Sequence, residues 1–143
     1  MHMGTVAIDW KKYNNFFELW RAHKKDNKLL YVIGEQRHCY IGSIGSRNGV
    51  RGLGTRYQWQ YVHRARSIFG ADESAAQVAY AGSFKNPDQI TGQLIRAAEA
   101  SVQRHCITTL GLENVLFAPE KLIEGVDVTN HGELPFFIQQ TNR

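Results

Sequence analysis

Apolar residues near the start of the chain recur at helical spacing. Four aromatic side chains follow one another at offsets of 3, 4 and 3: Trp10, Tyr13, Phe17 and Trp20. This spacing puts all four on one face of a helix, and Asp9 is suited to cap its first turn. The pattern predicts a helix over residues 10–23 that packs its aromatic face on the core.

Two short apolar stretches follow a polar turn at residues 24–28. Residues 29–33 read Leu-Leu-Tyr-Val-Ile, a composition typical of a buried strand. Residues 34–37 hold a glycine and three polar side chains, which suits a hairpin connection into a second strand at residues 38–43. The sequence therefore predicts a β-hairpin with one tyrosine on each strand.

The next region changes from glycine-rich to periodic. Glycines and small polar residues between positions 42 and 54 predict a loop. Helical spacing then returns, with Tyr57, Tyr61, Ala65 and Ile68 on one face and Arg56, Gln60, His63 and Ser67 on a polar face.

The second half of the chain predicts a strand and a long helix. Residues 77–84 are typical of a strand, and Asn86-Pro87 is suited to open a helix that reaches His105 or Cys106. Beyond Gly111 the pattern weakens. Short strands at residues 115–117 and 135–138 and a short helix at 119–124 are expected there.

Together these elements predict one α+β domain over residues 1–143. Its sheet is small, antiparallel or mixed, has three or more strands led by the tyrosine-bearing hairpin, and is flanked by helices. A composition of 43% apolar and 21% charged residues is typical of a soluble globular domain. No stretch reaches the roughly 18 apolar residues of a membrane helix, so we expect no membrane partner.

Net charge and cysteine content constrain the fold and function less than the hydrophobic pattern does. The net charge of +4 is compatible with a polyanionic partner and by itself favours nucleic acid only weakly. Cys39 and Cys106 lie far apart without a C-x-x-C pair, which indicates neither a zinc site nor a disulfide framework. We expect reduced thiols and a cytoplasmic location.

The hairpin carries the first candidate chemistry. Tyr31 and Tyr40 are nine positions apart with a turn between them, so adjacent strands can bring their hydroxyls close together. Two half-buried strand tyrosines with a packing role remain the alternative.

These residues resemble the GIY-YIG nuclease family. Tyr40-Ile41-Gly42 matches the second motif, whereas Leu29-Leu30-Tyr31 keeps the tyrosine of the first motif and lacks its glycine. The family places an arginine on the following helix and a glutamate on a later one, and this chain has the elements in that order. The resemblance implies a core at about 29–114, with the helix at 10–23 as an addition and residues 115–143 as an extension.

Residue by residue, the resemblance implies a phosphodiester-cleaving site. Tyr31, or water relayed through it, would act as the base with support from Tyr40, and Arg56, or failing it Arg51, would hold the phosphate. Gln60 stands where the family often has His or Tyr, which leaves His63 as the nearest substitute.

The metal would bind to Glu99, in Leu-Ile-Arg-Ala-Ala-Glu-Ala-Ser-Val. One carboxylate suits Mg²⁺, or Mn²⁺, because the ion also takes water and phosphate oxygens. A surface glutamate paired with Arg96 or Gln103 is the alternative. The supporting asparagine of the family would be Asn114, with Asn130 as the other choice.

The function implied by the resemblance is a metal-dependent endonuclease that hydrolyses DNA phosphodiester bonds, most simply in duplex DNA. The alternative is a catalytically inactive nucleic-acid-binding module on the same fold, and a structural or protein-interaction domain ranks third. DNA contacts would come from the loop at 44–54, the N-terminal helix, the C-terminal segment or the second subunit of a homodimer.

Overall fold

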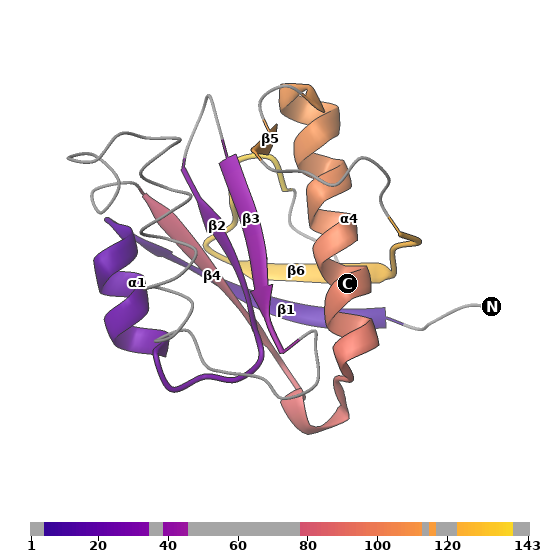
Figure 1. The fold of residues 1–143 in the computed structure, drawn as a ribbon, viewed down its shortest axis with the longest axis horizontal. Coiled ribbons are helices and arrows are strands. Elements are labelled where there is room, and N and C mark those ends of the chain that lie inside the picture. The colour runs from indigo at the N-terminus through magenta and orange to yellow at the C-terminus, as the bar shows by residue number, and fades with distance from the viewer. Residues whose placement is uncertain (1–4, 35–38, 46–77, 113–114, 117–122, 139–143) are drawn as a thin grey trace.

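The computed structural model describes residues 5–34, 39–45, 78–112, 115–116 and 123–138, which form a sheet between two helical layers (Figure 1). The elements in chain order are β1 (Thr5–Tyr13), α1 (Phe16–His23), β2 (Leu29–Ile33), β3 (Cys39–Ile44), β4 (Ala79–Phe84), the 3-10 turn η3 (Pro87–Gln89), α4 (Gly92–Leu110), β5 (Val115–Leu116) and β6 (Asp127–Gly132).

The described strands form one mixed sheet of six strands in the order β5-β3-β2-β4-β1-β6. The strand β2 pairs antiparallel with both β3 and β4, and β4 pairs antiparallel with β1. The two outermost pairs, β3 with β5 and β1 with β6, are parallel. The expected α+β class with a mixed sheet is therefore confirmed, and the hairpin β2–β3 is present, but β1 and not the hairpin is the first strand.

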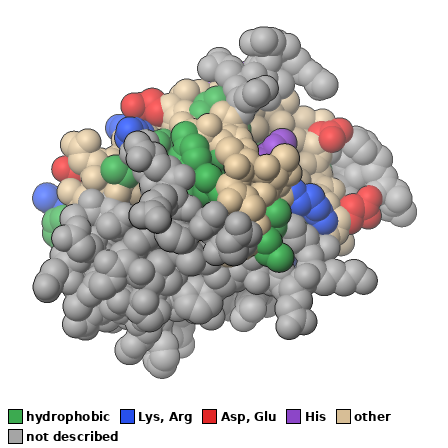
Figure 2. Space-filling view, turned by 90° about the horizontal axis from the view of Figure 1, so that it is seen from above, with side chains coloured by type: hydrophobic (Ala, Val, Ile, Leu, Met, Phe, Trp, Pro, Cys, Tyr) green, Lys and Arg blue, Asp and Glu red, His purple; other side chains and the backbone are tan. Residues whose placement is uncertain are grey.

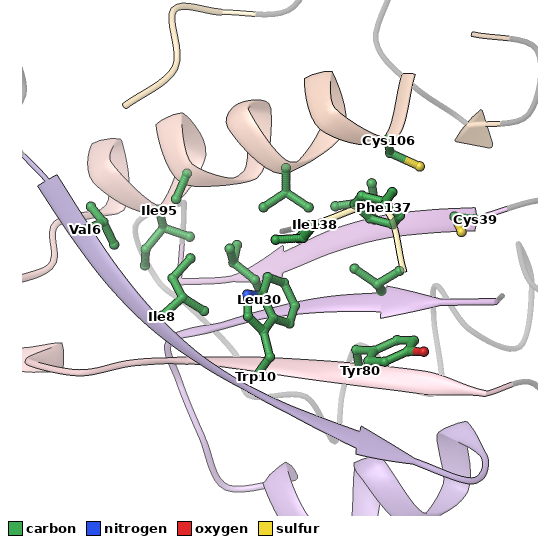
Figure 3. Close-up of a cluster of buried hydrophobic side chains, with 14 of the residues drawn as sticks. Val6, Ile8, Trp10, Leu30, Cys39, Tyr80, Ile95, Cys106, Phe137 and Ile138 are labelled. Carbon is green, nitrogen blue, oxygen red and sulfur yellow. The ribbon is translucent and has the colours of Figure 1, made fainter. Parts of the chain in front are cut away.

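Each face of the sheet is covered by one of the described helices. Alternate residues of β2 point to opposite faces, so Leu30 and Val32 join the cluster under α4, whereas Tyr31 joins the cluster under α1. Figure 3 shows the α4 side, where Ile95 points from the helix toward Leu30 and the strands. Each fully buried aliphatic side chain of this size contributes about 1.5–3 kcal/mol to folding.

The helix expected at residues 10–23 is wrong in its first part. Residues up to Tyr13 belong to β1, in which Val6, Ile8 and Trp10 alternate into the core. That period-2 pattern prevails over the helical spacing because β1 lies between two strands, β4 and β6, and satisfies its backbone groups on both edges.

The actual helix α1 begins after Asn15, whose side-chain oxygen accepts a hydrogen bond from the Glu18 backbone amide at 2.9 Å. Its buried face consists of Phe16 and Leu19, while Phe17 from the expected aromatic face is 43% exposed. The cap residue is therefore Asn15 and not Asp9.

The long helix also begins and ends later than expected. Asn86-Pro87 opens only η3, and α4 begins after Thr91, whose hydroxyl accepts from the Leu94 amide at 3.1 Å. The helix runs past His105 to Leu110 and stops at Gly111, which has a φ of 90°. Cys106 lies in the core, and the extra turn adds Ile107 and Leu110, which are partly buried against the same cluster.

The C-terminal part differs most from expectation. Residues 135–138 form a turn closed by the Ile138 amide and the Pro135 carbonyl at 2.9 Å, so a strand there is wrong. The apolar pattern arises because Phe137 and Ile138 pack into the cluster under α4. The true strand β6 is largely polar and was not expected.

Two other expectations near this end are tested only in part. A short strand at Val115–Leu116 is confirmed, while residue 117 lies outside the described residues. Of the expected helix at 119–124, only residues 123 and 124 are described, and they are not helical. Within the described chain, no helix combines the length and apolar character needed to cross a membrane.

Candidate active site

The β2–β3 hairpin brings the two tyrosines together. Tyr31 pairs with Gly42 and Ile33 pairs with Tyr40, so the two tyrosines are diagonal neighbours on the same face of the sheet. Their ring centroids are 6.1 Å apart, and the ring planes meet at 55°. The hairpin therefore gives one pair of phenols, as the spacing predicted.

Gly42 provides the space in which the Tyr31 phenol lies. A Cβ atom at Gly42 would be 2.5 Å from both Cζ and Oη of Tyr31, closer than real Cβ contacts. The phenol end of Tyr31 thus lies directly over the backbone of β3, and only glycine leaves room for it. Tyr31 and Gly42 form one packing unit, although they come from the two separate halves of the motif.

The tyrosine pair is enclosed. Tyr31 is 2% exposed and Tyr40 is 7% exposed. The ring of Phe16, from the first turn of α1, lies edge-on to Tyr31 with centroids 6.0 Å apart. The phenols therefore lie in a largely apolar setting between the sheet and α1, where electrostatic interactions are stronger than in water.

Glu99 lies in a different layer from the tyrosines. It is half-buried on α4, between the buried residues Ala98 and Ala100. Since α4 packs on the cluster that includes Leu30 and Ile41, it covers the face of the sheet opposite to the phenols. The structure brings Tyr31 and Tyr40 together and leaves Glu99 on the helix across the sheet.

Other expected site residues lie outside the described residues: Arg56, its fallback Arg51, His63 and Asn114. The alternative asparagine, Asn130, is described. It is 5% exposed on β6, and its side-chain oxygen accepts a hydrogen bond from Trp10 Nε1 at 2.8 Å. Asn130 therefore has a structural role, joining β6 to β1 through the core.

The donor chemistry for a metal is sparse in the described residues. No group of three or more His, Cys, Asp or Glu side chains gathers there. The single carboxylate of Glu99 still suits Mg²⁺, an ion that keeps several waters and uses phosphate oxygens of its substrate as ligands. It would not suit Zn²⁺, which requires three or four protein donors.

A polar cluster that the sequence did not predict joins the ends of β1 and α1. Tyr13 Oη and His23 Nε2 are 2.8 Å apart, and His23 Nδ1 and Asp26 Oδ2 are also 2.8 Å apart. An ionised Asp26 can only accept, so Nδ1 donates to it and Nε2 of a neutral imidazole accepts from Tyr13.

Burial raises the pKa of the Tyr13 phenol, and the carboxylates of Asp26 and Glu133 raise it further. Tyr13 is therefore held neutral, as a donor and not as a nucleophile. The available sequence signal was the i, i+3 spacing of His23 and Asp26, and assigning Tyr13 to a helix hid the third member.

A polar groove of about 640 Å³ lies between α4 and β6. Ser101 Oγ donates to the Val126 carbonyl at 2.8 Å and accepts from the Val126 amide at 3.0 Å. Arg104 donates from its guanidinium to the Ile123 carbonyl. These contacts attach the segment before β6 to the helix, so Ser101 and Arg104 of the groove are engaged in structure.

The chain was also compared with known proteins. No protein-family model, curated protein or solved structure matches it.

Proposed function

We propose that this protein is a metal-dependent endonuclease of the GIY-YIG type, which hydrolyses phosphodiester bonds of duplex DNA. The observation that carries the proposal is the Tyr31 phenol, which lies over Gly42 and beside Tyr40. This arrangement gives a physical reason for a tyrosine on the first strand and a Tyr-x-Gly on the second.

The order of the elements gives further support. The hairpin β2–β3 is followed by β4, which pairs antiparallel with β2, and then by α4, which carries Glu99. The resemblance implied a tyrosine hairpin followed by a later helix with a glutamate. The described part of the chain agrees with that sequence of elements.

In the proposed reaction, Tyr31 takes a proton from the attacking water, directly or through a relay, and Tyr40 holds the phenol network in place. A phenol has a pKa of about 10 and is a weak base at neutral pH, so it requires a nearby cation. By the resemblance, Arg56 would supply that cation and hold the phosphate, and His63 would support it.

We assign the divalent cation, Mg²⁺ or Mn²⁺, to Glu99 by the resemblance alone, because α4 lies across the sheet from the phenols. When bound, such an ion polarises the phosphoryl oxygens and stabilises charge that develops on the leaving oxygen. The chain's own contribution would be one carboxylate on a rigid helix.

The test is cleavage of supercoiled plasmid in Mg²⁺ and in EDTA. Tyr31→Phe and Glu99→Gln should each lower the Mg²⁺-dependent rate by about 100-fold or more, since each removes a group used in the chemical step. Tyr80→Phe is the matched control, because Tyr80 is an equally buried strand tyrosine on the opposite face. Full activity in both site variants would overturn the assignment.

A second candidate is a nucleic-acid-binding module that does not cleave. The observation that favours it is the position of Glu99 on the helix across the sheet from nearly inaccessible phenols. Binding of duplex DNA without Mg²⁺-dependent nicking by the wild-type protein would select this candidate over the nuclease.

A further inference from the structure

Two stretches of the chain carry an excess of positive charge: residues 36–70, which hold six Arg and no Asp or Glu, and the shorter segment 11–28, which lies within the described residues. Residues 11–28 hold six Lys and Arg against two Asp and Glu, which is the full net charge of +4. The remaining residues hold eleven of each sign and are neutral overall. Within the described residues, a polyanion would therefore be attracted most strongly to the end of β1 and to α1.

Lys12 is exposed on the other face of the sheet, where it lies over the ring of Tyr80. Four more of these cations are exposed on the side that α1 covers: Lys11, Arg21, Lys24 and Lys25. We call this set the α1 basic surface. In Figure 2, Lys and Arg side chains lie beside hydrophobic and acidic ones at the left-hand end, where α1 lies in Figure 1. Glu18 is the exposed acidic residue on the helix.

Aromatic rings lie under most of these cations. Arg21 lies over the ring of Phe17 at 5.9 Å, and Lys24 lies over the ring of Trp20 at 5.2 Å. Lys11 lies 5.5 Å from the ring of Tyr13. A cation held on a ring keeps its charge and loses part of its rotamer freedom, so less entropy is lost when it meets a phosphate.

The α1 basic surface lies directly outside the hairpin site. The buried face of α1 contacts the tyrosine cluster through Phe16 and Leu19. Arg21 is exposed on this helix and Lys24 and Lys25 just after it, while Lys11 lies on β1. A helix is about 10 Å across, so a phosphate backbone on the outer side would pass within roughly one helix diameter of the phenols.

We propose that the α1 basic surface binds the phosphate backbone of duplex nucleic acid through cations that lie over aromatic rings. In this way it positions the duplex beside the hairpin. This inference rests on the proposed function in taking a nucleic acid as the polyanion. The surface reads no base sequence, because its cations contact phosphates alone.

The test measures binding of a fluorescein-labelled 20-base-pair duplex in EDTA, so that no cleavage occurs, across a range of salt concentrations. Each phosphate neutralised adds about −0.9 to the slope of log K against log salt concentration. Arg21→Gln combined with Lys24→Gln should flatten the slope by about 2 and weaken binding roughly tenfold.

The matched control is Lys85→Gln combined with Arg96→Gln, which removes the same charge from exposed sites away from α1. It should leave the slope nearly unchanged. Equal effects of the two double variants, or an unchanged slope in the α1 variant, would overturn the proposal. Circular dichroism and thermal melts confirm that each variant is folded.

The contribution of the aromatic rings under these cations can be measured separately from that of the charges. Phe17→Ala should weaken binding about threefold while leaving the salt slope unchanged, because the number of cations stays the same. Phe136→Ala is its control, since Phe136 is 41% exposed and Phe17 is 43% exposed. An unchanged affinity in Phe17→Ala would refute the role of the rings.

Failure of the surface proposal can be distinguished from failure of the nuclease proposal. Binding through α1 without any cleavage would uphold the surface and refute the nuclease. Cleavage by the wild-type protein, together with an unchanged salt slope in the α1 double variant, would uphold the nuclease and refute the surface. Binding to phosphatidylserine-containing vesicles, with none to the duplex, would overturn the surface proposal in favour of a membrane.

Discussion

Gly42→Ala is the sharpest test of how the hairpin is built. The new methyl group would lie 2.5 Å from Cζ and Oη of Tyr31 and 2.9 Å from its Cε2, within a largely buried cluster. Overpacking of this kind costs about 1–3 kcal/mol, whereas replacing a strand glycine by alanine alone gains about 0.5–1 kcal/mol. We therefore expect a net loss of about 1–2 kcal/mol in the free energy of unfolding.

The cause can be isolated in a double-mutant cycle with Tyr31→Leu. Leucine lacks the three ring atoms that the methyl group would meet, so Gly42→Ala should be neutral or slightly stabilising in that background. Urea unfolding followed by circular dichroism measures the four variants, with a slope of about 1–3 kcal/mol per molar urea. An equal cost in both backgrounds would refute the idea that the Tyr31 ring requires Gly42.

Gly82→Ala gives a comparison on the other face of the sheet. Its added methyl would lie 2.9 Å from Ile8 Cγ2 and from Trp10 Cζ3, and 3.0 Å from Trp10 Cη2. These distances are longer than those at Gly42, so the loss of stability should be smaller. A larger loss at Gly82 than at Gly42 would mean that the ability of neighbours to shift, and not distance, decides the cost.

Three further outcomes are expected. Asn130→Leu should destabilise the fold by about 1–3 kcal/mol in urea unfolding, because it leaves the buried Trp10 Nε1 without its acceptor; a neutral result would contradict the pairing. Thr91→Ala should cost about 1 kcal/mol through loss of the α4 cap, and Thr91→Ser should restore most of it. Because the folded pKa of Tyr13 is raised above its ordinary value of 10.0, its contribution to stability is fully present below pH 10 and is lost as the pH rises through the folded value. Tyr13→Phe should therefore lose less stability than the wild type between pH 9 and pH 11, and parallel losses would exclude the effect.

The hairpin was predictable because its signals are local. Sixteen consecutive positions contain all of them: a run of five apolar residues, a glycine-containing turn and a second strand. The proximity of the Tyr31 and Tyr40 rings followed from that. The sequence did not reveal why residue 42 must be glycine, because that depends on the side from which the Tyr31 ring approaches the strand.

The error at the N-terminus has a tertiary cause. Residues 6–20 carry both an alternation through Val6, Ile8 and Trp10 and a helical aromatic spacing from Trp10 to Trp20, and local propensity cannot choose between them. The segment forms a strand because it pairs with β4 and β6, which come from far along the chain. For the same reason β6 was missed, since its polar sequence becomes a strand only by pairing beside β1.

Of the candidate site, the sequence placed the two tyrosines correctly relative to each other and could not place Glu99. Helical periodicity tells which residues share a face, and Glu99 was correctly put at the border of an apolar face. It does not tell which side of a sheet the helix covers. That is decided by the connection between β4 and α4, which sequence patterns leave open.

The position of β1 inside the sheet also dictates an order of folding. Its hydrogen bonds are made to strands from late in the chain, and the Trp10–Asn130 contact spans 120 positions. Closing such long loops is slow, whereas the β2–β3 hairpin closes within a few residues. During synthesis on the ribosome, the apolar side of β1 must therefore remain unpaired while the hairpin forms, and it needs protection from aggregation until β4 emerges.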